Sequence, residues 1–434
     1  MLDKTKQLIS NLFTMQMVML MASISTLLYF ILKTHLFYNL ASPIGDEICF
    51  IDANTLIEKN GLYQELCHGK ISPVFSILST FLNYFINDIL ITYRIISVIA
   101  TLTTLFLVFN FAKNKLKIAG HYLAGIIILT ISFLGFRIYW QGLNDAIFHL
   151  LVVISFYMLY NIQFSKNTTR NFIYLGIIFG LMIGTRFLAF VILPCFVFFF
   201  LKSTKNTLIV GTTTLLVGLI FHLPSLTNGN GFSDQDKEPK NGMTWAQKNY
   251  LSQKLIYENK LKVGNRVTWG ELENYIKENG KETLPTKFTE TLTLSPEITL
   301  NSFYNNVIFS VKNIYFQFLG FGLLLLFYIY YFALKNKEIL DVNLKFNLKF
   351  TSSFWLHTLL ISLVSFTQIE PRWYTSFIYL AIVMTYWFFQ NLTNINEGRK
   401  AFLLKLNLFI IIMYQLQFIV TDHNLLSAYL RQLV

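Results

Sequence analysis

Residues 43–47 read Pro-Ile-Gly-Asp-Glu and lie shortly after the first long apolar run of the chain, 15–32. Two adjacent carboxylates, Asp46 and Glu47, therefore lie next to a predicted membrane surface. A carboxylate is costly to hold near lipid, so an ionisable pair at such a place is a candidate functional site. We interpret Asp46 as the catalytic carboxylate of a membrane enzyme.

The composition is that of a polytopic membrane protein. Of 434 residues, 54% are hydrophobic and 13% are charged, which is about half the charged share of a soluble domain. The net charge of +12 comes from short Lys and Arg clusters between apolar runs. These clusters are typical of cytoplasmic loops facing anionic lipid. We therefore expect an all-α protein whose partner is membrane lipid and not nucleic acid.

Apolar length and the Lys/Arg bias together predict about eleven transmembrane helices, with a cytoplasmic N-terminus and a short external C-terminus. The run 15–32 lacks a cleavage site and is expected to be retained as the first span. The stretch 172–201 is either one long span or two short helices that meet at Arg186. Basic residues flank both ends and favour two helices. The predicted spans are 15–32, 90–112, 122–139, 143–163, two helices within 172–201, 208–223, 306–334, 350–366, 373–392 and 402–420.

Three units follow from this assignment: an N-terminal transmembrane module (1–224), a long external loop (225–302) and a C-terminal transmembrane module (303–434). The first external loop, 33–89, belongs to the N-terminal module. Within it, 48–60 has apolar residues at helical spacing before Gly61, which predicts an amphipathic helix on the membrane surface. The apolar stretch 73–86 is too short for a span and predicts an interfacial helix. Cys49 and Cys67 share this loop, either as a disulfide or as two free thiols.

Four charged residues at predicted outer ends of spans are candidates for chemistry. Asp46 and Asp145 each open a predicted helix, where a carboxylate serves either as a base or ion ligand or as a simple helix cap. Arg186 lies between two apolar helices and needs a carboxylate or a lipid phosphate as its partner. Arg372 follows Glu370 and Pro371, and its guanidinium fork suits a phosphate. The alternative is a structural ion pair between Glu370 and Arg372.

The order of these motifs along about residues 15–392 resembles the GT-C glycosyltransferase superfamily. It is most similar to the bacterial branch related to aminoarabinose transferases and protein O-mannosyltransferases. The resemblance lies in an order of weak motifs, among them the Asp-Glu pair before a surface helix and the Gly-rich helix that ends at a basic residue. The motifs are Asp46-Glu47, Gly61-Leu62-Tyr63, Lys70-Ile71-Ser72-Pro73, Tyr93-Arg94, Gly180 to Arg186, and Pro371-Arg372-Trp373-Tyr374.

The resemblance implies a GT-C-like architecture and an inverting transfer of a sugar from a polyprenyl-phosphate-linked donor. The acceptor, a lipid, glycan or protein, would react on the outer, periplasmic face of the cell inner membrane. On this interpretation Asp46 is the general base and Asp145 the second carboxylate. Glu47, Arg186, Arg372 and Tyr374 form the substrate-binding set, in which the two arginines hold the donor phosphate. Some relatives use a divalent metal at the acidic pair, and the sequence leaves metal dependence open.

Three other functions remain open. An O-antigen-type polymerase or ligase also has many spans and a large outer loop, but it would rely on arginines and histidines in that loop. A lipid or sugar transporter or flippase should carry charged or broken segments near the middle of its spans, and often internal repeats. A non-catalytic assembly subunit would tolerate the loss of Asp46.

Overall fold

The computed structural model describes residues 17–25, 43, 45–133, 141–164, 168–200, 204–239, 241–335, 342–364, 371–391 and 396–421. These residues form helices joined by short connections, and no strand occurs among them. The all-α prediction is therefore confirmed. Most of the predicted first span, Glu370 and the predicted external C-terminus lie outside the described residues.

The stretch predicted as the first external loop contains three helices. They are α3 (Glu47–Asn60), α4 (Leu62–His68) and α5 (Pro73–Ile86). Gly61 ends α3 with a φ of 89°, a conformation that is strained for residues with a Cβ atom. The prediction of a short helix ending at Gly61 is confirmed, and α5 has the predicted bounds. Cys49 and Cys67 are free thiols.

The remaining helices of the N-terminal module form one side of a bundle. α8 packs against α6 and α9, and α11 packs along α9. The helices are α6 (Ile89–Asn110), extended by a π-helical turn (Phe111–Lys115), α7 (Gly120–Phe133), α8 (Asp145–Phe164), α9 (Thr169–Thr185), α10 (Ala189–Ile192), the 3-10 segment η3 (Leu193–Phe199) and α11 (Thr204–Thr227).

The helix break within 172–201 occurs where the sequence predicts it. α9 ends at Thr185, and Arg186 adopts an extended conformation with φ −160° and ψ 136° before α10 begins. The prediction of two short helices that meet at Arg186 is confirmed. The break leaves the Arg186 side chain at the end of a helix and not in the middle of one.

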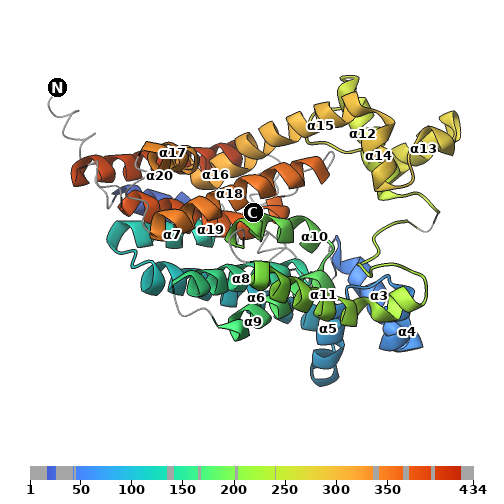
Figure 1. Ribbon diagram of the computed structural model, residues 1–434. Helices are drawn as coiled ribbons and strands as arrows, with labels where there is room; N and C mark the ends of the chain where they lie inside the picture. Colours follow the sequence, from blue (N-terminus) through green and yellow to red (C-terminus); the bar gives the residue numbers. More distant parts are fainter. Residues whose placement is uncertain are drawn as a thin grey trace, which may run out of the picture.

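The long loop folds into a small helical domain, called the outer domain here (residues 241–302). Tyr250, Leu251 and Leu272 belong to a hydrophobic cluster that is separate from the core of the bundle. Figure 1 shows α12 to α14 at the same end of the bundle as α3 and α4. The helices of the outer domain are α12 (Trp245–Tyr257), α13 (Trp269–Asn279), η4 (Lys281–Thr283), α14 (Phe288–Leu294) and the start of α15 (Pro296–Phe309).

The C-terminal module departs from the prediction at one place. The expected span 306–334 is not one continuous helix, because the chain breaks at Gly320, which has a φ of 55°; its crossing of the membrane stays a prediction. A Cβ atom at Gly320 would lie 2.4 Å from Oδ1 of Asn407, so a close helix contact also requires glycine there. The segments are a π-helical stretch (Ser310–Tyr315), α16 (Phe316–Leu319), α17 (Gly322–Lys335), α18 (Val342–Val364), η7 (Pro371–Trp373), α19 (Thr375–Gln390) and α20 (Glu397–Thr421).

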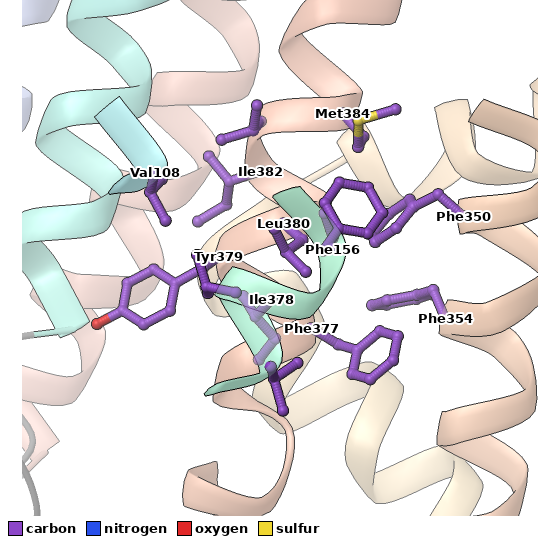
Figure 2. Close-up of a cluster of buried hydrophobic side chains, with 14 of the residues drawn as sticks. Val108, Phe156, Phe350, Phe354, Phe377, Ile378, Tyr379, Leu380, Ile382 and Met384 are labelled. Atoms are coloured by element: carbon purple, nitrogen blue, oxygen red, sulfur yellow. The ribbon is translucent and has the colours of Figure 1, made fainter. Parts of the chain in front are cut away.

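The helix α19 runs through the centre of the bundle. Every residue from Thr375 to Phe389 is buried. Figure 2 shows Phe377 of α19 near Phe350 and Phe354 of α18, with Phe156 of α8 in the same cluster. A helix that is apolar on all sides is typical of a buried position. α19 therefore gives the residues just before it, including Arg372, a fixed place at one end of the bundle.

The membrane character of the chain is confirmed by the described helices. Three of them are long and apolar enough to cross a membrane: Ile89–Lys115, Asp145–Phe164 and Thr204–Thr227. Several further apolar helices are shorter. The number of eleven spans and their orientation stay predictions.

Candidate active site

The Asp46 carboxylate faces two cations and does not cap the helix that follows it. Asp46 precedes α3 without a side-chain capping hydrogen bond. Its Oδ2 accepts hydrogen bonds from Lys237 Nζ at 2.7 Å and from Arg372 Nη1 at 3.0 Å. A third of its side chain is exposed. The capping alternative therefore does not describe this residue.

Asp145, the first residue of α8, lies beside the same arginine. Its fully buried carboxylate forms salt bridges with Arg186 and, at 3.4 Å, with Arg372. A buried carboxylate is strongly destabilising unless it has such partners. Arg372 therefore connects Asp46 to Asp145. The structure brings together the two carboxylates and two arginines that the sequence predicts as separate candidates.

Helix breaks at one end of the bundle place these four side chains. Asp46 lies before α3, Asp145 starts α8, Arg186 lies between α9 and α10, and Arg372 belongs to the short turn η7 before α19. The Arg372 carbonyl is also hydrogen-bonded to Nε2 of His149, at 2.9 Å. Residues at helix ends have side chains that reach beyond the packed helices, so four distant segments meet in one cluster.

Glu47 has a different place from its neighbour. Its fully buried carboxylate accepts two hydrogen bonds from Arg94, both of 2.9 Å, and one from the Gly142 N–H at 2.8 Å. A Cβ atom at Gly142 would lie 2.2 Å from the Cβ of Tyr93, so only glycine allows this approach. The structure thus gives Glu47 a positioning role between α3 and α6. Glu47 is not among the residues that line the cavity of about 410 Å³ next to Asp46.

Tyr374 also lies away from the four charged residues. Its side chain is fully buried, and its hydroxyl forms a 2.8 Å hydrogen bond with Ser310 Oγ. Its ring packs edge-on against Tyr315, with centroids 5.6 Å apart. The predicted substrate-binding residue is therefore placed in the core that holds η7 and α19 in position.

Lys237 is a site residue that the sequence predictions miss. It belongs to residues 233–238, which we call the strap, in the long loop before the outer domain. The strap is fixed by backbone hydrogen bonds from Asp234 to Gly69 O (3.3 Å) and from Asp236 to Lys70 O (3.0 Å). The mixed charges of 234–238 were visible in the sequence, but they lie in a long polar loop that carries many other charges. Nothing local in the sequence shows that they return to Asp46.

A cavity of about 410 Å³ joins the charged cluster to the outer domain. Asp46, Arg186 and Arg372 line one wall, and Trp245 and Arg266 of the outer domain line another. The other lining residues are Asn144, Asn249, Trp373 and the strap residues 234–238. A cavity with converging polar groups is the usual form of a substrate site.

The electrostatics of the cluster keep Asp46 ionised. Burial alone would raise the pKa of Asp46, but the charges and hydrogen bonds of Lys237 and Arg372 outweigh it and lower this pKa to about 2. Burial lowers the pKa of the Lys237 ammonium, and the Asp46 charge opposes that shift. In this arrangement Asp46 is a weak base. Its basicity rises when a ligand draws the two cations away.

The acidic pair does not fit a divalent metal held by both residues. Oδ2 of Asp46 contacts two cations, and both oxygens of Glu47 accept hydrogen bonds from Arg94. Metal ligands must offer free oxygen lone pairs that converge on one point. Within the described ranges, no group of three or more His, Cys, Asp or Glu residues forms a candidate metal site.

The model of one protein family matches residues 70–227, and its description is dolichyl-phosphate-mannose-protein mannosyltransferase. This family is of the GT-C type, so the predicted resemblance is confirmed over these residues. The matched stretch includes Asp145 and Arg186 and ends with α11. No curated protein matches the chain. Together with the all-α membrane fold, this match over residues 70–227 supports a membrane glycosyltransferase of GT-C type.

Proposed function

We propose that the protein transfers a sugar from a polyprenyl-phosphate-linked donor to an acceptor on the outer face of the cell inner membrane, with inversion at the sugar. One observation carries the proposal. The carboxylates of Asp46 and Asp145 meet the cations of Arg186, Arg372 and Lys237 beside a cavity at the end of the bundle. The reaction needs a base for the acceptor and cations for the phosphate, and the cluster supplies both.

The donor phosphate is expected to bind Arg372 and Lys237. Both contact Asp46 through the same oxygen, and an incoming phosphate offers them a second anionic partner. An Arg fork binds phosphate in a bidentate manner, whereas Lys acts as a point charge. Asp145 keeps Arg186 and Arg372 oriented during this exchange. The negative charge that develops on the leaving phosphate is thus stabilised.

Release from its two cations raises the pKa of Asp46 and makes it a competent base. The acceptor hydroxyl then attacks the anomeric carbon from the face opposite the phosphate. A new carbon–oxygen bond forms to the acceptor, and the bond to the phosphate oxygen breaks. The proton moves to Asp46, and the polyprenyl phosphate leaves with the electron pair. A single displacement of this kind inverts the configuration at that carbon.

The rival polymerase or ligase function has less support. It relies on arginines and histidines of the long loop, whereas 225–302 contains Arg266 as its single arginine and has no histidine. Three salt bridges at the site join Asp46, Asp145, Arg186 and Arg372, which lie outside the long loop.

The test compares Asp46→Asn and Asp145→Asn with the parent, using polyprenyl-phosphate mannose as the donor probe and a native membrane extract as the acceptor source. We expect Asp46→Asn to bind donor but to transfer at least a hundredfold more slowly, in line with a general-base contribution of about 10²–10⁴. Asp52→Asn is the matched control, because Asp52 is exposed on the same helix. Full activity of Asp46→Asn would refute the mechanism.

A further inference from the structure

Two amide side chains of the cavity are held by main-chain carbonyls. Asn144 Nδ2 donates to the carbonyl of Thr185 at 2.9 Å. Thr185 is the last residue of α9, so its carbonyl lacks a partner within the helix. Gln235 Nε2 donates to the carbonyl of Cys49 at 3.0 Å. A carbonyl accepts hydrogen bonds and cannot donate them, so the NH₂ group of each amide has to face it. Each amide oxygen is therefore left to accept a bond from another group.

Neither amide oxygen has a hydrogen-bond donor in the described part of the chain. Asn144 is 3% exposed, and no described group donates to its Oδ1. Oε1 of Gln235 is buried and also has no partner among the described residues. A buried polar atom without a partner retains the full cost of its desolvation. The two oxygens therefore call for O–H or N–H donors from water or from a ligand.

Both amides lie beside the residues to which the proposed function assigns the donor phosphate. Asn144 and Gln235 line the cavity of about 410 Å³ together with Arg372 and Lys237. Asn144 directly precedes Asp145, whose carboxylate forms a salt bridge with Arg372. Gln235 belongs to the strap and precedes Lys237 by two residues. The sugar of the donor is bonded directly to its phosphate, so it would occupy the part of the cavity next to these groups.

We propose that Asn144 and Gln235 accept hydrogen bonds from hydroxyl groups of the transferred sugar and thereby determine which sugar the site selects. A sugar ring carries O–H donors, whereas an ionised phosphodiester offers acceptors alone, so the two amide oxygens suit the sugar and not the phosphate. A site that bonds to substrate hydroxyls discriminates against an analogue without them, because the buried partner is then left unpaired. The inference rests on the proposed function, from which it takes the position of the phosphate.

The test measures lipid binding to the full-length protein in nanodiscs by calorimetry. The probes are polyprenyl-phosphate mannose, polyprenyl-phosphate glucose and polyprenyl methyl phosphate, which carries the same charge but no sugar. We expect at least one hexose lipid to bind more tightly than the methyl ester. The tighter hexose lipid is then compared with versions that each lack one hydroxyl. At least two of these deoxy versions should bind the parent about 3- to 10-fold more weakly, which is the value of one neutral hydrogen bond.

Asn144→Leu and Gln235→Met remove the amides at similar side-chain volume. Each should weaken binding of the hexose lipid about 3- to 10-fold and leave binding of polyprenyl methyl phosphate unchanged. Each variant should also stop responding to the loss of one particular hydroxyl, because that hydroxyl no longer has its partner. A merely structural role would weaken the binding of both lipids alike. Gln64→Met is the matched control, because Gln64 is exposed and does not line the cavity. It should keep the affinities of the parent.

The inference is overturned if neither hexose lipid binds more tightly than the methyl ester. It is also overturned if both variants respond to every deoxy version as the parent does, which would mean that water alone occupies the two amide oxygens. If one variant fails to fold, the other decides. If both fail, equal binding of all deoxy versions to the parent overturns the inference.

The methyl ester keeps this inference apart from the proposed function. Arg372→Gln should lose affinity for polyprenyl methyl phosphate, and unchanged binding there would refute the donor-phosphate site. If Arg372→Gln loses that affinity while Asn144→Leu and Gln235→Met keep the parent's preference for the hexose lipid, only the sugar contacts are refuted.

Discussion

Removing one partner of the buried ion pair between Glu47 and Arg94 should strongly destabilise the fold next to the site. Glu47 is fully buried and Arg94 is 17% exposed, and two 2.9 Å hydrogen bonds join them. Removing one charge of a buried pair costs roughly 3–5 kcal/mol. Glu47→Gln keeps one acceptor for the Gly142 N–H, and Arg94 retains some contact with solvent. We therefore expect a loss of roughly 2–4 kcal/mol in the free energy of unfolding.

A double-mutant cycle separates the pair from the packing around it. Chemical unfolding in mixed micelles would be measured for Glu47→Gln, Arg94→Gln and the double variant. The coupling energy should be roughly 1–3 kcal/mol, because the second substitution removes a charge that the first leaves unpaired. Glu58→Gln is the control on the same helix, because Glu58 is exposed and should change stability by less than about 0.5 kcal/mol. Simple additivity, or a Glu47→Gln variant as stable as the parent, would refute this assignment.

Two further predictions follow from the same region. The pKa of Asp46 is lowered from 3.8 to about 2, so its stabilising contribution is complete above about pH 4 and is lost as the pH falls through about 2. The difference in unfolding free energy between the parent and Asp46→Asn should shrink over that interval, and a constant difference would contradict the assignment. Gly142→Ala should destabilise the fold by roughly 1–3 kcal/mol, because the new Cβ would overlap Tyr93. Thermal unfolding checks this against Gly211→Ala, whose new Cβ meets no atom within 4 Å.

The sequence predicted the positions of the charged residues better than their roles. The break at Arg186 could be predicted because basic residues at both ends of 172–201 require both ends on the same side. The meeting of Asp46, Asp145, Arg186 and Arg372 followed from their placement at helix ends on one predicted face. Each of these inferences uses one-dimensional information, namely distance along the chain and charge.

The different surroundings of Asp46 and Glu47 could not be predicted from distance along the chain and charge. Neighbouring residues at a helix start point about 100° apart around its axis, so the two carboxylates of an acidic pair tend to meet different surroundings. Which member faces the cavity depends on the partner each one meets. Arg94 on α6 forms an ion pair with Glu47, and Lys237 of the strap forms one with Asp46. Both partners come from distant segments, and no local pattern marks the contacts.

The net charge of the assembled cluster bears on the mechanism. The described salt bridges join three cations (Arg186, Arg372 and Lys237) to two carboxylates (Asp46 and Asp145), which leaves one net positive charge. A phosphodiester donor carries one negative charge and would neutralise it. Proton transfer to Asp46 raises the cluster to two positive charges while the phosphate monoester product gains a second negative charge. Within this set of five side chains and the donor, the two changes cancel, so the reaction leaves no uncompensated charge among them. A cluster without Lys237 would have no net charge before donor binding, so this lysine should matter for holding both the donor phosphate and the charged product.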